Sequence, residues 1–198
     1  FVRKKEYLDT NIRGTKNILE LCSYLKIKKI IFSSTAAVYG SSKNEKIREN
    51  SIISPINPYG KSKIEAEKIL KEYSLKRNFN IIVFRFFNAC GGDSKGRIGE
   101  LHKPETHLIP KLMQFVLDNN NQKFLVYGNK FRTTDGFAIR DYLHVLDICD
   151  AINLGVEWLK NNRGYQTINL GSGIPTSVLQ IIKSFNQFFN KEIKFSVE

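Results

Sequence analysis

The residues best suited to chemistry in this chain are Tyr59 and Lys63, which lie four positions apart, and Thr35, which lies upstream. Residues four apart on a helix share one face, with Cβ atoms about 5–6 Å apart. A free tyrosine is a poor base at neutral pH unless a nearby positive charge favours its ionised form. Because Lys63 can supply that charge, the combination predicts proton and hydride chemistry on a sugar alcohol.

The Tyr-to-Lys spacing alone is not specific, because it occurs three times: Tyr24/Lys28, Tyr39/Lys43 and Tyr59/Lys63. Tyr24 precedes the basic end of a helix, where lysines complement the helix dipole. Tyr39 is followed at once by Gly40, Ser41 and Ser42, which is typical of a loop. Only Tyr59 opens a convincing helix, with apolar residues recurring at helical spacing after it.

Thr35 follows a short apolar run, Ile30 to Phe32, which is typical of a buried parallel strand. Ligands of open α/β sheets bind at the carboxyl ends of such strands. Taken alone, Ser33, Ser34 and Thr35 are equally well interpreted as ordinary polar loop residues. Their combination with Tyr59 downstream favours a site.

The elements that must position these residues alternate in type. We expect helices over residues 9–25, 59–76, 108–117 and 146–159, and strands over 29–32, 81–86, 124–127 and 167–170. A last helix runs through Phe189, with Ser177 and Gln180 as its capping box. Alternation of this kind predicts an α/β fold with a parallel sheet, and residues 89–140 interrupt it as a smaller subdomain.

The chain lacks the usual start of a dinucleotide-binding fold. Such a fold begins with a strand and a Gly-rich turn, yet residues 1–30 contain only Gly14. The glycines at 92, 96 and 99 are followed by a Pro-containing loop instead of a helix, so they do not replace that turn. The chain also starts at Phe1, and we interpret it as an internal fragment whose amino-terminal strands are missing.

Composition narrows the class of protein. The 198 residues carry a formal net charge of +12, but the lysines are scattered and no aromatic-interleaved basic motif predicts nucleic-acid binding. A positive field would favour a diphosphate substrate. No apolar run of membrane-spanning length or secretory leader is found, so we expect no membrane association and a cytoplasmic location. Three cysteines and three histidines lack metal-site spacing, which predicts no metal.

Several ordered blocks of sequence resemble the extended short-chain dehydrogenase/reductases, and most closely the UDP-glucose (UDP-galactose) 4-epimerases of galactose metabolism. These blocks are residues 11–15, the Thr35 segment, Tyr59 to Lys63, 85–88, 105–110, 140–145 and 169–173. The related sugar 4,6-dehydratases carry an Asp-Glu pair just after the threonine, and this chain has Ala36 and Ala37. Alanine cannot transfer a proton, so the resemblance favours epimerisation over elimination of water.

The resemblance implies a Rossmann-like fold and NAD-dependent epimerisation at carbon 4 of a UDP-hexose through a 4-keto intermediate. Residues 1–90 and 141–171 would form part of the NAD-binding domain, and 91–140 and 172–198 part of the substrate-binding subdomain. The full-length protein would be a homodimer that pairs through the helices near 9–25 and 59–76.

The resemblance also implies roles for individual residues. The catalytic residues would be Thr35, Tyr59 and Lys63, with Lys63 lowering the pKa of Tyr59. The cofactor would contact Thr10, Asn11, Thr35, Tyr59, Lys63 and Phe87. The nucleotide sugar would contact Thr35, Asn88, His107, Leu108, Leu125, Tyr127 and Arg140.

Alternatives remain open at several of these positions. Arg140 fits a diphosphate but could instead pair with Asp141 or Asp147. Asn11 could cap its helix, although Asp9 is the better cap. His107 and Phe137 depart from the family pattern and could alter substrate contacts or loop packing.

Two other interpretations of the function stay open. The chain could belong to another extended reductase that acts on a nucleotide sugar: a UDP-N-acetylhexosamine 4-epimerase, a decarboxylase or a reductase. It could also be a non-catalytic fragment or binding module that keeps the fold without turnover.

Overall fold

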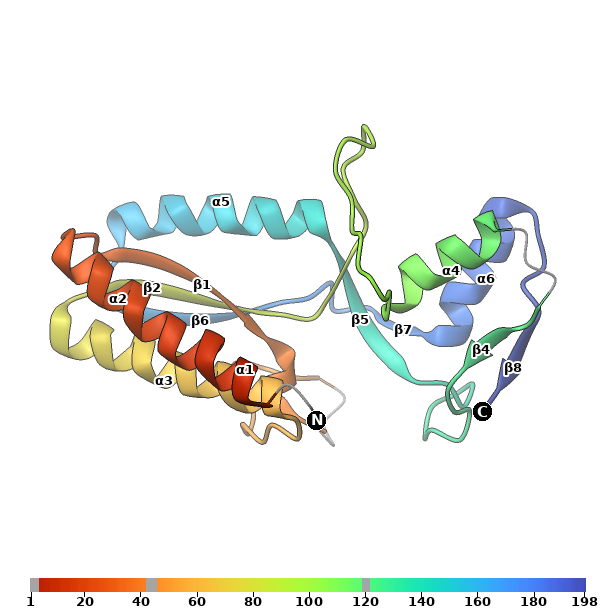
Figure 1. Cartoon of the computed structure of the whole chain (residues 1–198), viewed down its shortest axis with the longest axis horizontal. Helices are drawn as coiled ribbons and strands as arrows, with labels where there is room; N and C mark the ends of the chain where they lie inside the picture. The colour runs from red at the N-terminus through yellow and green to blue at the C-terminus, as the bar shows by residue number, and fades with distance from the viewer. Residues whose placement is uncertain (1–3, 42–45, 119–121) are drawn as a thin grey trace. The chain divides into compact units, whose positions relative to one another are not determined.

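The computed structural model describes residues 4–41, 46–118 and 122–198 (Figure 1). The backbone divides into two compact units, residues 1–87 with 147–170 and residues 88–146 with 171–198. The sequence predicts bounds at residues 90 and 141, but residues 88–90 and 142–144 pair with each other as strands and lie in the second unit. Which unit binds cofactor and which binds substrate stays a prediction.

The first unit is built on a parallel sheet of three strands in the order β1-β2-β6. Its strands are β1 Lys29–Thr35, β2 Asn80–Phe86 and β6 Tyr165–Leu170. Its helices are α2 Gly14–Tyr24, α3 Pro58–Arg77 and α5 Val145–Asn161, of which the last begins at the boundary of the second unit. The predicted α/β architecture with a parallel sheet and flanking helices is therefore confirmed.

The core of this unit follows from the alternation of side chains along β2. Successive strand residues point to opposite faces, so one set packs against α2 and α3 and the other against α5, as the layers in Figure 1 show. The first cluster contains Leu19, Leu70, Phe79, Ile81 and Val83, and the second contains Ile82, Phe84 and Leu159. Four of the five apolar residues of β2, Ile81 to Phe84, are at most 2% exposed, so the central strand is buried on both faces.

β1 differs from its prediction in length and burial. The strand runs through Ser33, Ser34 and Thr35 instead of ending at Phe32. Its apolar residues are only half-buried, because β1 lies at the edge of the sheet formed by the described residues. The polar residues expected in a loop are therefore held in the regular geometry of a strand.

The first helical segment begins earlier than predicted and contains an irregular turn. α1 Lys4–Leu8 leads through a π-helical turn, η1 Asp9–Arg13, into α2. Asp9 is thus inside the segment, where its carboxylate pairs with Arg13 at 2.8 Å, and the prediction that it caps the helix is wrong. Single π-turns of this kind are frequently found at functional sites.

The second unit holds shorter elements around a separate core. Its strands form a β3-β5-β7 sheet and a β4-β8 pair, and its apolar cluster includes Leu112, Phe137 and Ile182. The elements are β3 Asn88–Cys90, α4 Leu108–Leu117, β4 Phe124–Val126, β5 Ile139–His144, β7 Pro175–Ser177, α6 Val178–Phe189 and β8 Phe195–Val197. The predicted helices and the capping box of Ser177 with Gln180 are confirmed.

None of the helices in the described parts of the chain combines the length and the apolar character that crossing a membrane would require.

Candidate active site

Tyr59 and Thr35 are brought together by the start of α3 and the end of β1. The side chain of Asn57 accepts a hydrogen bond from the Gly60 N–H at 2.7 Å, which starts the helix one turn before Lys63. The Thr35 side chain lies within reach of the Tyr59 phenol and lowers its pKa. The two hydroxyl groups that the sequence predicts as one site therefore do lie close together.

Gly60 permits this close approach. A methyl group at Gly60 would lie 2.6 Å from the carbonyl oxygen of Ala37, which is too short for any ordinary contact. Ala37 belongs to the 3-10 turn η2 Ala36–Tyr39, which directly follows Thr35. The absence of a side chain at Gly60 thus lets the first turn of α3 lie against the end of β1.

Lys63 lies in the same environment as the Tyr59 ring. Its Nζ lies 4.9 Å from the ring centroid of Phe32 and 5.9 Å from that of Tyr59. The ammonium donates a hydrogen bond to the carbonyl oxygen of Ser33 at 2.9 Å. Phe32, Ser33 and Thr35 all belong to β1, so one strand end organises both members of the Tyr-Lys pair.

The pKa of Tyr59 is raised in this structure, whereas the resemblance implies that Lys63 lowers it. Burial raises the pKa of the phenol above its ordinary value near 10, and the Thr35 side chain only partly offsets that rise. Burial likewise lowers the pKa of Lys63, and the carboxylate of Glu67 opposes that shift. In this structure burial outweighs the groups that lower the pKa of Tyr59, and the role of Lys63 in making the phenol acidic stays a prediction.

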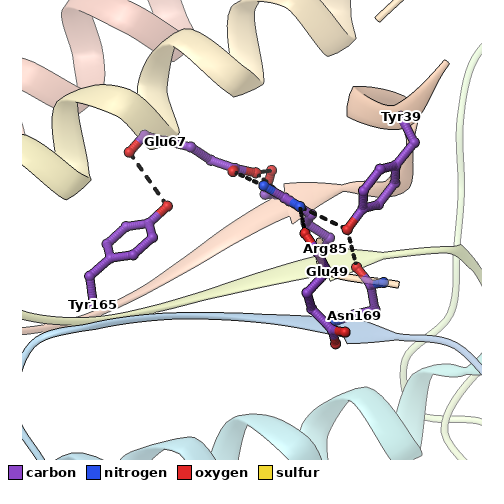
Figure 2. Close-up of polar contacts among 7 residues, drawn as sticks. Tyr39, Glu49, Glu67, Arg85, Tyr165 and Asn169 are labelled. Carbon is purple, nitrogen blue, oxygen red and sulfur yellow. Dashed lines mark hydrogen bonds and ion pairs between the residues drawn. The ribbon is translucent and has the colours of Figure 1, made fainter. Parts of the chain in front are cut away.

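A buried polar network includes Ser34, the residue of β1 that precedes Thr35, and centres on Arg85 and Glu67 (Figure 2). Arg85 of β2 donates to both carboxylate oxygens of Glu67 on α3, at 3.0 and 2.6 Å. It also donates to the Tyr39 hydroxyl at 2.7 Å, which in turn donates to Asn169 Oδ1 at 2.7 Å. Ser34 donates to Glu67 at 2.5 Å. The network joins β1, β2, β6, η2 and α3 in one place.

Residue type and spacing did not identify Ser34, Glu67 and Arg85 as part of the site. One signal for them was present, because Arg85 is the only charged residue of the apolar run from Ile81 to Phe86. A buried charge is stable only when paired and hydrogen-bonded. Glu67 also lies four positions after Lys63, on the same face of the predicted helix.

The other predicted cofactor residues of the first unit occupy different places. Thr10 and Asn11 lie on η1 and line a pocket of about 330 Å³ beside Phe32 and other residues of β1. Asn11 does not cap a helix, since its side-chain amide donates to Ser62 Oγ of α3 at 2.9 Å. Phe87 follows β2, where its N–H donates to the Leu170 carbonyl. Among the described residues, no hydrogen bond joins any of these three to Tyr59, Thr35 or Lys63.

Apart from Thr35 on β1, the predicted substrate residues lie in the second unit and are mostly exposed. Leu125 and Tyr127 are 42% and 68% exposed; Asn88, His107 and Arg140 are exposed, and Leu108 is half-buried. Asn88 and Arg140 lie on the neighbouring strands β3 and β5. Among the described residues, no hydrogen bond or ion pair joins any two of these six side chains. Bonds between these side chains therefore do not hold the six residues together.

Arg140 does not form the salt bridge to Asp141 that the sequence left open. The Asp141 carboxylate instead accepts hydrogen bonds from the N–H and hydroxyl of Ser172 and from the N–H of Gly173, at 2.7 to 2.8 Å. Arg140 donates to the carbonyl oxygen of Ile139, and no ion pair of Arg140 is found in the described part of the chain. Its guanidinium is therefore available to an anion.

One group of side chains in the second unit has the composition of a metal site, contrary to the expectation from spacing. Ligand atoms of Glu100, His102, Glu105 and His107 all lie within 4.8 Å of one another. The Nδ1 atoms of the two histidines lie 2.9 and 2.6 Å from one oxygen of Glu100. Because hydrogen bonds from the imidazoles to this carboxylate account for these distances, the cluster needs no ion.

Residues 1–171 match the model of the NAD dependent epimerase/dehydratase family, and the chain belongs to that family. The UDP-glucose 4-epimerase of Rhizobium leguminosarum bv. trifolii is 37% identical over 185 residues, which are 93% of this chain and 56% of that protein. The UDP-glucose 4-epimerase of Halalkalibacterium halodurans is 38% identical over 182 residues, which are 92% of this chain and 54% of that protein.

A solved structure gives the same result for the fold. The crystal structure of UDP-glucose 4-epimerase from Brucella ovis in complex with NAD matches with a TM-score of 0.93 at 37% identity, covering 99% of this chain and 60% of that chain. The chain spans a little over half the length of the curated relatives it matches. The resemblance predicted from the sequence blocks is thus confirmed.

Proposed function

We propose that the protein catalyses NAD-dependent epimerisation at carbon 4 of a UDP-hexose, which interconverts UDP-glucose and UDP-galactose. The observation that carries this proposal is the position of Tyr59 and Lys63 at the start of α3, with Lys63 bonded to the end of β1 that bears Thr35. Ala36 and Ala37, which follow Thr35, offer no acid or base for an elimination. The names of the relatives support the choice of substrate.

The donor set fits the ribose of a nicotinamide nucleotide. An ammonium has three N–H donors, and among the described residues Lys63 uses one of them on the Ser33 carbonyl. The remaining donors suit the ribose hydroxyls, and Thr10, Asn11 and Phe87 are the other proposed cofactor contacts. A bound NAD held by these residues would supply reversible hydride transfer at carbon 4 of the sugar.

Tyr59 is the proposed group that moves the proton of the sugar 4-hydroxyl. In this structure its raised pKa keeps the phenol protonated at neutral pH, which suits proton donation to a 4-oxygen. Accepting a proton requires a positive charge nearer to the phenol, and the oxidised nicotinamide carries such a charge. Thr35 would hold the same oxygen through its hydroxyl and stabilise its developing charge.

The nucleotide sugar is proposed to contact the exposed side chains of the second unit. Arg140 suits the diphosphate, because its planar guanidinium matches phosphate oxygens and has no ion pair in the described chain. Asn88, His107, Leu108, Leu125 and Tyr127 would contact the remaining groups of the UDP-sugar.

We also propose that the full-length protein is a homodimer that pairs through α2 and α3. α2 presents large apolar side chains to solvent, with Ile18 57% and Leu21 52% exposed. Contiguous exposed apolar surface of this kind is typical of protein interfaces.

The test is conversion of UDP-galactose to UDP-glucose by the natural protein in the presence of NAD. Tyr59→Phe removes the proton-transfer group and is expected to lower kcat by about 10²–10⁴-fold. Tyr24→Phe is the matched control, because Tyr24 has the same spacing to a lysine but is exposed. Equal rates for wild type and Tyr59→Phe would contradict the proposal.

The same assay separates the alternatives. Faster turnover of UDP-N-acetylgalactosamine than of UDP-galactose would favour the N-acetylhexosamine epimerases. Turnover of neither substrate by the natural protein would favour a binding module that keeps the fold without catalysis.

A further inference from the structure

Three residues of α3, spaced four apart, each contact one of three consecutive residues of β1. We call Tyr59, Lys63 and Glu67 the α3 row. Lys63 Nζ donates to the Ser33 carbonyl at 2.9 Å, Glu67 Oε1 accepts from Ser34 Oγ at 2.5 Å, and the Tyr59 phenol lies within reach of the Thr35 side chain.

These three contacts together define one position of the helix against the strand. Residues four apart lie on one helical face, so all three members of the row point toward the same end of β1. Sliding α3 by one turn, about 5.4 Å, would break every contact at once. The meeting of Tyr59 with Thr35 therefore depends on the other two contacts.

Glu67 is the most strongly held member of the row. Its side chain is 3% exposed and that of its partner Arg85 is 7% exposed. Arg85 lies directly opposite Ser34 in the register of β2 against β1. Glu67 is thus bonded from two adjacent strands, by Ser34 of β1 and by Arg85 of β2.

Arg85 also bonds to the 3-10 turn that follows β1. Its Nη1 donates to the hydroxyl of Tyr39, whose ring is 2% exposed. Tyr39 closes the 3-10 turn that begins just after Thr35. Arg85 therefore links Glu67 of the α3 row to Tyr39 in the turn after Thr35 (Figure 2).

We propose that Glu67, held by Arg85 and Ser34, is a positioning residue that aligns Tyr59 with Thr35. Glu67 acts through the helix and does not reach the reacting atoms. The catalytic meaning of this alignment rests on the proposed epimerase function, whereas the alignment itself does not. The alternative is that the buried ion pair contributes only to the stability of the fold.

The mildest test removes one bond of the network without exposing a charge. Ser34→Ala deletes the hydroxyl that Glu67 accepts from, and Arg85 still pairs with the carboxylate. Ser74→Ala is the matched control, because Ser74 is a buried serine of α3 (7% exposed) outside the row. With UDP-galactose, Ser34→Ala is expected to lower kcat by about 10- to 100-fold with KM within about twofold, since misplacement by about 1 Å can cost 10²-fold.

A double variant separates positioning from stability. Glu67→Gln alone leaves Arg85 buried without its anion, which destabilises the fold. Glu67→Met with Arg85→Met removes both charges, and replacing a buried pair by apolar side chains of similar volume is often neutral for stability. We expect this protein to unfold at a urea concentration close to that of wild type while kcat stays low. Recovery of kcat together with stability would overturn the proposal.

An activity-free measurement keeps this inference distinct from the proposed function. The Thr35 side chain lowers the pKa of Tyr59, so loss of alignment should raise it further. NMR titration of an isotope-labelled Tyr59 ring carbon is expected to give a higher midpoint in Ser34→Ala and in the double variant, and an unchanged one in Ser74→Ala. If wild type does not epimerise UDP-hexoses, the proposed function fails and this titration decides the positioning. A midpoint unchanged in both folded variants would overturn the positioning itself.

Discussion

The two units of the chain use the same kind of ion pair in opposite settings. In the first unit Arg85 pairs with Glu67 through two hydrogen bonds, and both side chains are at most 7% exposed. In the second unit Arg97 pairs with Asp93 through two hydrogen bonds at 2.8 and 2.9 Å, but its side chain is 67% exposed. The two pairs have similar geometry, but breaking them should change the free energy of unfolding by different amounts. Solvent screens the exposed pair and cannot reach the buried one.

The same contrast extends to the proposed chemistry. The proton-transfer residues of the first unit are fixed by contacts made within the chain, to Thr35 and Ser33. The proposed substrate residues of the second unit, such as Tyr127 and Arg140, are exposed and not bonded to one another in the described chain. Groups that transfer a proton need alignment before substrate arrives, whereas specificity contacts can be completed by the ligand.

The largest effect should come from breaking the buried pair. Arg85→Met leaves the Glu67 carboxylate buried without its partner, so we expect the free energy of unfolding to fall by about 3–5 kcal/mol. Urea unfolding followed by circular dichroism measures this change. A loss below about 1 kcal/mol would mean that water reaches Glu67 and that the burial contrast between the units is absent.

The sequence predicted the parts of the fold that depend on local pattern. The helices from Tyr59 and from Leu108, and the strand from Ile81, follow apolar periodicity and occur close to the predicted bounds. The strands β3, β7 and β8 have only three residues each and carry no periodic pattern. Their formation depends on partners distant in sequence, so local pattern could not reveal them.

The candidate site was predictable to the extent that its residues lie on these periodic elements. Thr35, Tyr59 and Lys63 were identified from residue type and spacing, and the fold does bring them together. The pKa of Tyr59 was not predictable, because it depends on burial that no spacing encodes. The pairing of Glu67 with Arg85 likewise depends on the register of β2 against β1.

The next largest effect is the dependence of the free energy of unfolding on pH, which concerns a buried tyrosine of the first unit. Burial raises the pKa of Tyr165 to about 12, so between pH 10 and 12 the folded state holds this proton more tightly than the unfolded state. The free energy of unfolding therefore falls as pH rises through that window, by about 2 kcal/mol for this group. Tyr165→Phe should flatten the fall, measured by urea unfolding at a series of pH values.

The control for this titration is Tyr24→Phe. Tyr24 is 83% exposed, so its removal should leave the alkaline slope as it is in wild type. Equal slopes for wild type and Tyr165→Phe would show that the Tyr165 phenol is accessible to solvent and that its ionisation does not depend on folding.

A smaller effect belongs to the second unit. The Ser177 hydroxyl accepts from the Gln180 N–H at 3.1 Å and donates to Asp135 at 2.5 Å. Ser177→Ala removes this helix cap, which typically costs about 1 kcal/mol. Amide hydrogen exchange should become faster in the first turn of α6. Unchanged exchange there would show that the cap does not hold the start of this helix.

The smallest effect is expected for the exposed pair. Arg97→Gln breaks the bonds to Asp93, but surface ion pairs contribute little because water replaces them. The urea midpoint should match that of wild type within error. A loss as large as that of Arg85→Met would contradict the contrast between the two units.

The most direct test of the described site is a measurement of the pKa of the Tyr59 phenol in the unliganded wild-type protein. An NMR titration of its labelled ring carbon, assigned with Tyr59→Phe, gives the pKa of the phenol where it lies against Thr35. We expect a midpoint above 10, because the effect of burial on the pKa of Tyr59 outweighs that of Thr35. A midpoint at or below 10 would contradict the described site, because the phenol would then be solvated or in direct contact with the ammonium of Lys63.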